Sequence, residues 1–366
     1  MRLAWGWVVG VDRISADYEE LTVRFEDEAA SSDARAVCYP ALSGHVMPGE
    51  RVLLNTTAVD LDLGTGGLHF VVARATEKAT GEPQLDAPSG GHVMKLRYTP
   101  LQLDVLSVEE QGSASHPAMA TATDLGGMPV ACCGLHSQAP LVAAAIKTSN
   151  PDLTVAYVMT DFAALPLALS KVVRESVKAG LIDATVTCGQ AFGGTLEAVN
   201  LHSGLLAARH VSHADIAIVA IGPGVVGTAT PFGHGGIAQG EAINAVASLG
   251  GRPVAVLRLS QADTRPRHQG VSHHTTTALT KIALAPAMVA MPRRDGRNDW
   301  RLDEVERMLA SAGVWTRHER REAPALEPDT RGVVVTSMGR GPADDLLFFS
   351  AAYAAGGVCV QLLGET

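Results

Sequence analysis

Hydrophobic and polar residues alternate along the first part of the chain, in the pattern of short β-strands with one buried face. The alternation is clear from Trp5 to Val11 and from Leu21 to Phe25. Further short strands are predicted at 35–39, 51–55 and 68–74. Because turn residues and no helical pattern separate these strands, the sequence predicts a small all-β, barrel-like domain over residues 1–90.

From residue 128 onward, apolar runs alternate with helical patterns instead. Strands are predicted at 130–133, 154–159, 184–188, 216–221, 253–259, 287–291, 333–336 and 358–362. Helices are predicted between Pro166 and Gly180 and at 195–209, 240–249, 302–312 and 342–355. Apolar strands that alternate with helices are typical of a mostly parallel, doubly wound α/β sheet. We therefore expect an α/β domain over 128–366, joined to the barrel by a connecting segment over 91–127 that follows a Pro- and Gly-rich linker at 77–91.

Composition narrows the classes of partner. The chain has a formal net charge of -9, which argues against a nucleic-acid surface, and its longest apolar run, near 282–291, is shorter than the roughly 18 residues of a membrane-spanning helix. Its five cysteines form no CxxC pair. We expect a cytoplasmic protein that binds a small molecule rather than a membrane, with a homodimer left open.

A glycine-rich loop follows the predicted strand at 216–221. Its first part contains Gly222, Gly224 and Gly227, and Thr228 and Thr230 add hydroxyls. The glycines match GxGxxG formally, but the helix does not begin inside the motif, so a dinucleotide site is disfavoured. Exposed backbone N–H groups before a helix favour an anion, and the alternative is that the glycines only permit tight turns.

A second candidate loop, over residues 260–277, is rich in basic side chains. Arg265 and Arg267 lie in it, with Asp263 as its single acid. An arginine fork can hold a phosphate or a carboxylate through two hydrogen bonds. The loop therefore predicts anion binding, with an ordinary solvated surface as the alternative.

Histidines follow several of the predicted strands, where parallel sheets bind ligands. We predict that His234 lies within about 8 Å of at least one of His136, His273 and His274, close enough to share a substrate or a metal. The catalytic candidates are His136, His234, His274 and Asp161. No HxH or HExxH motif is present, so a divalent metal as cofactor stays open. Since adjacent residues on a strand point apart, only one of His273 and His274 is expected to face the site.

Several short motifs together resemble one protein family. They are Pro48-Gly49-Glu50-Arg51-Val52, Leu63-Gly-Thr-Gly-Gly67, Lys95-Leu-Arg-Tyr-Thr-Pro100, Cys133-Gly-Leu-His-Ser-Gln138, Gly233-His-Gly-Gly236, Ser272-His-His-Thr-Thr276 and Thr336-Ser-Met-Gly-Arg340. The chain resembles, over nearly its whole length, the bacterial domain of unknown function 3866 family. The resemblance implies a bacterial cytoplasmic protein of about this length, and it brings no activity, cofactor or catalytic residue.

The loops predict two alternative functions. The first is an enzyme that acts on a small anionic molecule, phosphorylated or nucleotide-like, which the glycine-rich loop and Arg265 and Arg267 hold while histidines supply acid–base or metal chemistry. The second is a ligand-sensing or scaffold protein that binds a metabolite without turnover. The number of acid–base groups favours the enzyme.

Overall fold

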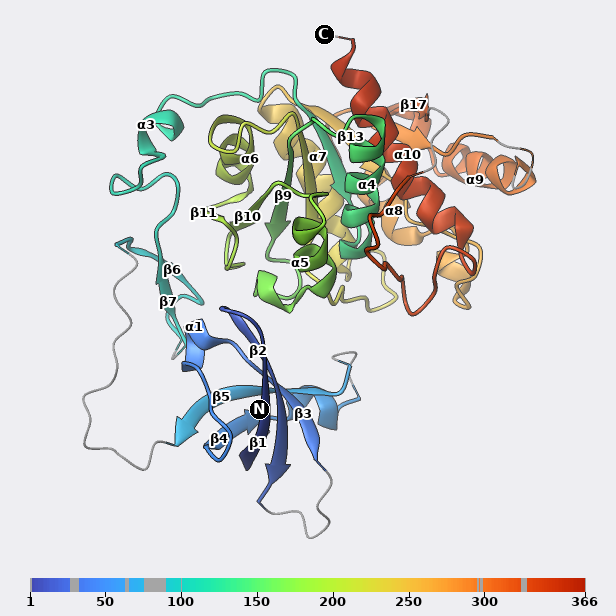
Figure 1. The fold of residues 1–366 in the computed structure, drawn as a ribbon. Helices are drawn as coiled ribbons and strands as arrows, with labels where there is room; N and C mark the ends of the chain where they lie inside the picture. Colours follow the sequence, from blue (N-terminus) through green and yellow to red (C-terminus); the bar gives the residue numbers. More distant parts are fainter. Residues whose placement is uncertain are drawn as a thin grey trace. The chain divides into compact units, whose positions relative to one another are not determined.

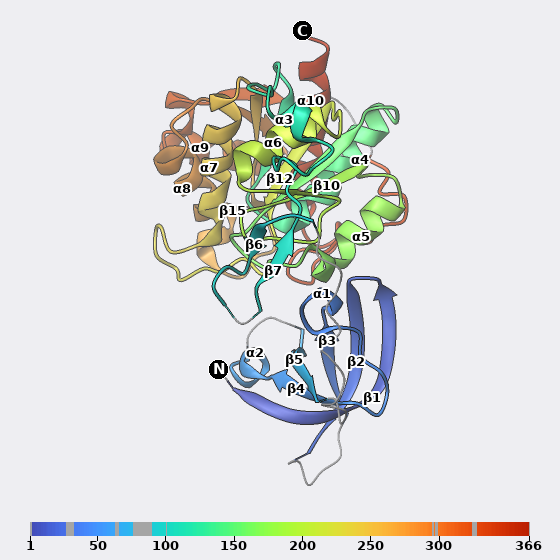
Figure 2. The same ribbon diagram turned by 90° about the vertical axis from the view of Figure 1, so that its left-hand side faces the viewer.

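The computed structural model of the chain describes residues 2–26, 33–62, 66–75, 90–99, 101–294, 296, 299–323 and 328–365. These residues form two compact units, Met1–Val105 and Leu106–Thr366, which are drawn in Figures 1 and 2. Most of the predicted linker at 77–91 lies outside the described residues.

The first unit contains a closed five-stranded barrel. Its strands are β1 (Leu3–Ser15), β2 (Tyr18–Phe25), β3 (Ala34–Cys38), β4 (Arg51–Asn55) and β5 (Leu68–Ala75), in the order β1-β2-β3-β5-β4. Alternate apolar residues such as Val23, Val52 and Leu54 are fully buried inside it, as the period of two predicts. The unit also holds two short helices, α1 (Pro40–Ser43) and α2 (Thr57–Asp60), and an antiparallel pair, β6 (Val93–Lys95) and β7 (Leu103–Val105). The predicted small barrel is confirmed.

The second unit is built on an eight-stranded sheet in which every neighbouring pair is parallel. Its order is β11 (Leu196–Ala198), β10 (Ala184–Cys188), β9 (Val155–Thr160), β12 (Ile216–Ile221), β8 (Pro129–Cys133), β13 (Arg252–Val256), β16 (Met288–Met291) and β17 (Glu319–Glu322). A two-stranded antiparallel pair, β14 (Leu259–Ser260) and β15 (Gly270–Val271), lies apart from it. The predicted parallel α/β sheet is confirmed.

Helices cover both faces of this sheet, as Figures 1 and 2 show. The apolar cluster on one face includes side chains from α4 (Ala139–Ser149), α5 (Lys171–Lys178) and α10 (Leu346–Leu363). The cluster on the other face includes α6 (Leu201–His210), α7 (Ala238–Ser248) and α9 (Asp299–Ser311). Along β8, Ala131 and Cys133 belong to the first cluster, and Val130 and Cys132 belong to the second. Two apolar faces explain why the strands read as continuous apolar runs.

Some predicted elements near the C-terminus are wrong. Residues 333–336 form no strand, and 358–362 lie inside α10, which does not end at Ala355. Gly356 lies in the middle of this helix, and a Cβ there would lie 2.5 Å from the carbonyl oxygen of Val142. This glycine therefore serves the close packing of α10 on α4 and does not end the helix.

Other elements were predicted with wrong bounds or missed. The predicted helix at 195–209 begins only at Leu201, because residues 196–198 form β11. The helix α4 was not predicted, and neither were α3 (His116–Met119) and α8 (His273–Thr277). The helix α10 is long and apolar enough to cross a membrane, but 67% of it is buried inside the protein, which is the packing of a core helix.

The strand order places the polar loops of the second unit at one edge. After β8 the chain passes to β9, beyond β12, and after β12 it passes to β13, beyond β8. The chain therefore leaves these two central strands in opposite directions. Such a switch point opens a crevice at the carboxyl ends of the strands, which is where α/β sheets bind ligands.

Candidate functional site

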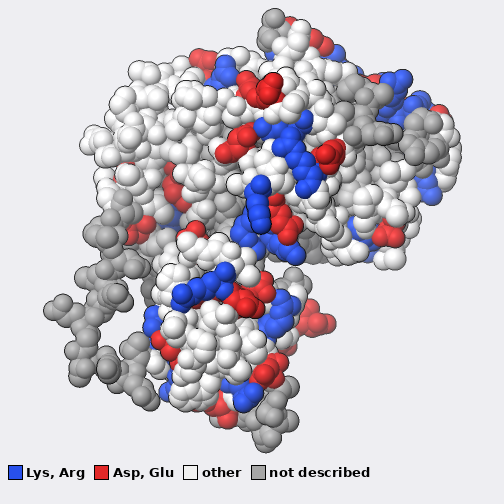
Figure 3. Space-filling model, in the orientation of Figure 1, with Lys and Arg blue, Asp and Glu red and all other residues white. Residues whose placement is uncertain are grey.

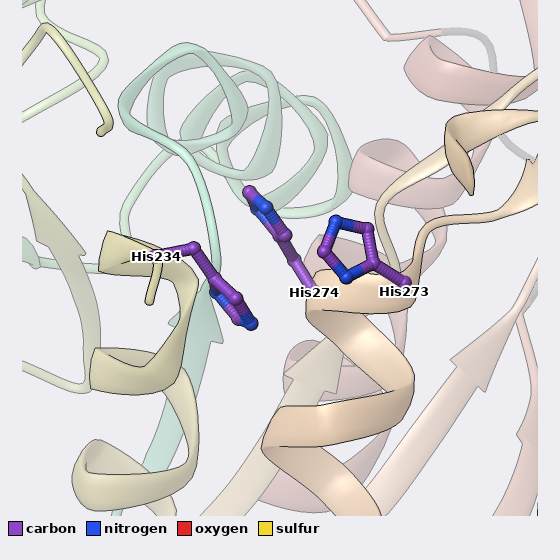
Figure 4. A group of neighbouring side chains, drawn as sticks. All are labelled: His234, His273 and His274. Atoms are coloured by element: carbon purple, nitrogen blue, oxygen red, sulfur yellow. The ribbon is translucent and has the colours of Figure 1, made fainter. Parts of the chain in front are cut away.

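Three histidines from two segments meet at this edge, as Figure 4 shows. His234 ends the glycine-rich loop before the short 3-10 helix η3 (Gly235–Ile237), and His273 and His274 open α8. The ring of His234 stacks on that of His274 with 3.8 Å between the centroids, and its centroid lies 5.3 Å from that of His273. The predicted convergence within about 8 Å is confirmed.

The expectation that His273 and His274 point apart is wrong. Their ring centroids lie 4.4 Å apart, because both residues belong to the first turn of a helix and not to a strand. Successive helical side chains are separated by only about 100° around the axis, since a turn takes about 3.6 residues. Ser272 fixes this helix start, because its hydroxyl accepts a hydrogen bond from the backbone N–H of His274.

Two imidazole nitrogens in the cluster are buried without a hydrogen-bond partner among the described residues: Nδ1 of His234 and Nε2 of His273. Nε2 of His234 lies 3.0 Å from the carbonyl oxygen of Pro231. Because a carbonyl only accepts, Nε2 carries the proton and Nδ1 keeps its lone pair. Buried polar atoms without partners are rare in folded proteins, so these two point to a ligand.

Arg258, just after β13, completes the cluster. Its side chain is buried, and its Nη1 donates a hydrogen bond of 3.0 Å to Nδ1 of His274, which leaves the proton of that imidazole on Nε2. No carboxylate forms an ion pair with Arg258 in the part of the chain that the structure describes. Burial, with the charges of Arg265 and Arg340 nearby, lowers the pKa of Arg258 to about 10. The guanidinium is still charged near neutral pH, and a buried cation of this kind calls for an anion.

The neighbouring histidines are neutral near pH 7. Burial, together with the surrounding cations, lowers the pKa of His274 to about 2 and that of His268 to about 3. The pKa values of His234 and His273 are also lowered, again mainly by burial. The cluster therefore combines one permanent charge with imidazoles that can accept or donate protons.

Sequence reasoning missed Arg258 because it lies within the apolar run 253–259, which was interpreted as a strand. The signal was present, however, because an arginine in such a run is rarely buried unless it is paired.

The two arginines predicted to clamp an anion, Arg265 and Arg267, have different partners and different exposure in the structure. Arg265 binds Asp263 through two hydrogen bonds, of 2.9 and 2.7 Å, and Arg340 lies 3.5 Å from the same carboxylate. These contacts hold the pKa of Asp263 well below its usual range. Arg267 is exposed and has no ion pair among the described residues. The fork of Arg265 is therefore occupied by a carboxylate of the chain itself, and Arg267 is open to solvent.

The threonine hydroxyls of the glycine-rich loop bond within the loop. Thr228 Oγ1 lies 2.9 Å from Thr230 Oγ1 and donates to the carbonyl oxygen of Gly233, whose backbone N–H donates to Thr230 Oγ1. A backbone bridge pairs Gly227 with His234 across the same turn. These bonds fold the loop back so that His234 returns to the edge of the sheet.

The predicted glycines allow close approach at different points. A Cβ at Gly222 would lie 2.2 Å from the carbonyl oxygen of Ala164, and one at Gly227 would lie 3.5 Å from Nε2 of His274. Gly224 has φ +91, a conformation that favours glycine. Of the three glycines, Gly227 approaches the histidine cluster, whereas Gly222 lies against Ala164 and Gly224 has open space around it among the described residues. Anion binding by the loop backbone stays a prediction.

His136 and Asp161 are the remaining predicted residues, and among the described residues neither forms a hydrogen bond or an ion pair with the cluster. His136 is buried, with Nδ1 3.0 Å from the Tyr157 hydroxyl and Nε2 2.5 Å from the Ser170 hydroxyl. Burial lowers the pKa of His136 to about 4. Asp161 accepts a hydrogen bond of 2.9 Å from the backbone N–H of Gln190 and lines a separate cavity.

The cluster offers two kinds of ligand chemistry. One ligand nitrogen from each of His234, His273 and His274 lies within 4.8 Å of the others, and imidazole is a preferred ligand of zinc. The contact from Arg258, however, occupies Nδ1 of His274 and leaves a proton on its Nε2. As arranged, the site offers a lone pair on Nδ1 of His234 and N–H donors from Arg258 and from Nε2 of His274, and the donors suit an oxyanion.

Comparisons with known proteins agree with the resemblance in the sequence. The family model described as "Protein of unknown function (DUF3866)" matches residues 35–356. No curated protein matches the chain.

Proposed function

The chain belongs to the DUF3866 family, and we propose that it is an enzyme that acts on a small anionic molecule, phosphorylated or nucleotide-like. The substrate binds where Arg258 meets His234, His273 and His274. The observation that carries the proposal is the buried guanidinium of Arg258, which has no carboxylate partner among the described residues. A buried cation costs folding free energy unless it is paired, so its retention favours a role in binding an anion.

Each member of the cluster has a distinct role in this proposal. Arg258 and the Nε2–H of His274 donate to oxygens of the anion, and the low polarity of the buried site strengthens these contacts. Nδ1 of His234 accepts a proton from the substrate as a general base, a role for which its neutral form is required. Nε2 of His273 orients a substrate hydroxyl through a hydrogen bond.

The proposal extends to the partner of the protein and to its location in the cell. The partner is a small anion and not a nucleic acid, because the net charge is -9 and basic side chains lie beside acidic ones on the face drawn in Figure 3. A cytoplasmic location agrees with five buried cysteines that form no disulfide among the described residues. The glycine-rich loop and Arg267 cover the bound anion in this proposal.

A second candidate is that the cluster holds a transition-metal ion. The unpartnered nitrogens of His234 and His273 favour it, and metal-binding histidines commonly donate their other ring N–H to a backbone carbonyl, as His234 does to Pro231. His274 would join as a ligand only after Arg258 released it. Elemental analysis of purified protein separates the two candidates: one equivalent of zinc, lost in His273→Ala, favours the metal.

A ligand screen followed by a turnover assay tests the proposal. Thermal shifts are measured with inorganic phosphate, carboxylates, phosphorylated sugars and nucleotides, and each compound that stabilises the protein is then assayed for product. A ligand at about 100 times its Kd stabilises by roughly 2.7 kcal/mol. Stabilisation with product formation supports an enzyme. Stabilisation without product supports the ligand-sensing alternative, and no response to any anion contradicts both.

A further inference from the structure

A second cavity lies at the carboxyl ends of β9 and β10, with a volume of about 230 Å³. Two acidic side chains, Asp161 after β9 and Glu241 in the first turn of α7, line it. Its other lining residues are Thr160, Phe162, Cys188, Gly189, Asn200, Leu201 and Ala238. None of the roles proposed for the histidine cluster uses this cavity.

The two carboxylates repel each other and have no ion pair among the described residues. The pKa of Glu241 is raised, first by burial and then by the negative charge of Asp161. Asp161 is held in place by the backbone N–H of Gln190 and by the close approach of Gly189. A Cβ at Gly189 would lie 2.2 Å from Oδ2 of Asp161, and its φ is +63, so glycine suits this position on both counts. The local backbone thus keeps a carboxylate at the cavity.

A third polar group points independently to a ligand. The side chain of Thr160 is more than nine-tenths buried, and its hydroxyl has no hydrogen-bond partner in the part of the chain that the structure describes. Leaving a buried hydroxyl unbonded costs folding free energy, so a group that occupies the cavity is needed to satisfy it.

We propose that this cavity binds the ammonium group of a small organic amine between Asp161 and Glu241, with the Thr160 hydroxyl accepting one of its hydrogen bonds. A cation relieves the repulsion between the carboxylates, and an ammonium group has three donors to distribute among these oxygens. The apolar walls formed by Phe162 and Leu201 contact the carbon skeleton. A volume of about 230 Å³ also leaves room for several heavy atoms beyond the charged group, which a bare metal ion would not fill.

The test compares matched cationic, neutral and metal probes on the full chain. Binding of propylamine, ethanolamine and 1,4-diaminobutane is measured by ligand-observed NMR and by thermal shift in an amine-free buffer. The neutral control is 1-propanol, and the metal controls are Mg²⁺ and Mn²⁺. We expect at least one amine to bind at millimolar concentration or tighter and 1-propanol not to bind.

Variants then locate the amine. Glu241→Gln and Asp161→Asn should each weaken binding at least tenfold, whereas Asp12→Asn, the same charge change on an exposed barrel residue, should not. Thr160→Val should weaken binding without lowering the melting temperature of the unliganded protein, because it removes an unbonded hydroxyl. Equal amine binding in these variants, no amine binding, or binding of Mg²⁺ or Mn²⁺ that requires both carboxylates would each overturn the proposal.

Discussion

Replacing Arg258 with methionine should make the unliganded protein more stable while removing anion binding. The substitution keeps a long side chain in a buried position but deletes the charge. An arginine that serves only the fold would give the opposite result, because removing a buried structural partner is strongly destabilising. The sign of the stability change therefore separates a binding role from a structural one.

The magnitude follows from the lowered pKa of Arg258. Its fall from the ordinary arginine value to about 10 means that the folded protein disfavours the charged form by about 3 kcal/mol, at about 1.4 kcal/mol for each pKa unit. Losing the hydrogen bond to His274 costs about 1 kcal/mol, which leaves a gain of about 2 kcal/mol. For a domain of this size that gain corresponds to a rise of about 4 to 8 °C in Tm.

Differential scanning calorimetry at pH 7.5 measures the change on the transition of the larger unit. Arg258→Lys is the matched control, because it keeps a buried cation and should not show the gain. A Tm for Arg258→Met several degrees below that of the wild type would refute the reasoning and make Arg258 a structural residue.

Three further predictions concern the histidines and the loop. Because the pKa values of His136 and His274 are lowered in the folded protein, the unfolded chain binds protons first as the pH falls. The free energy of unfolding, measured with urea, should be highest above about pH 6.5 and fall by about 2 kcal/mol per histidine at pH 5. A flat pH profile would contradict this. His234→Ala should change Tm by little yet suppress anion binding or turnover, and an unchanged isotherm would remove His234 from the site. Gly224→Val and Gly227→Val should abolish ligand-induced stabilisation while the circular dichroism spectrum stays native, and unchanged binding in both would exclude the loop.

The periodicity of apolar residues predicted most of the fold. A strand with one buried face shows alternating apolar residues, and a strand buried on both faces shows a continuous apolar run. The bounds of β4, β10 and β12 agree with the predicted ones. The strand predicted at 358–362 failed because an all-apolar helix such as α10 has no polar face to reveal its period. Gly356 lies inside this helix, at a position where a larger side chain would clash with α4.

One part of the candidate site, the meeting of its histidines, could be predicted from the positions of these residues along the chain. His234 follows β12 and His274 lies beyond β13, the strands on either side of β8 in the parallel sheet, so their meeting at one edge follows from topology. Which nitrogen is unpartnered depends on contacts such as that with Pro231, which leave no trace in residue spacing. The same holds for the pairing of Arg265 with Asp263, which changes an expected anion clamp into an internal ion pair.

The central claim is that Arg258 and the histidines around it bind an oxyanion. The most direct measurement is isothermal titration of inorganic phosphate into the wild type, Arg258→Met and Arg35→Met, the last changing an exposed arginine of the barrel. The account predicts saturable binding to the wild type and to Arg35→Met, with affinity at least tenfold weaker for Arg258→Met. Equal affinity in all three proteins, or no heat of binding in the wild type, would contradict it.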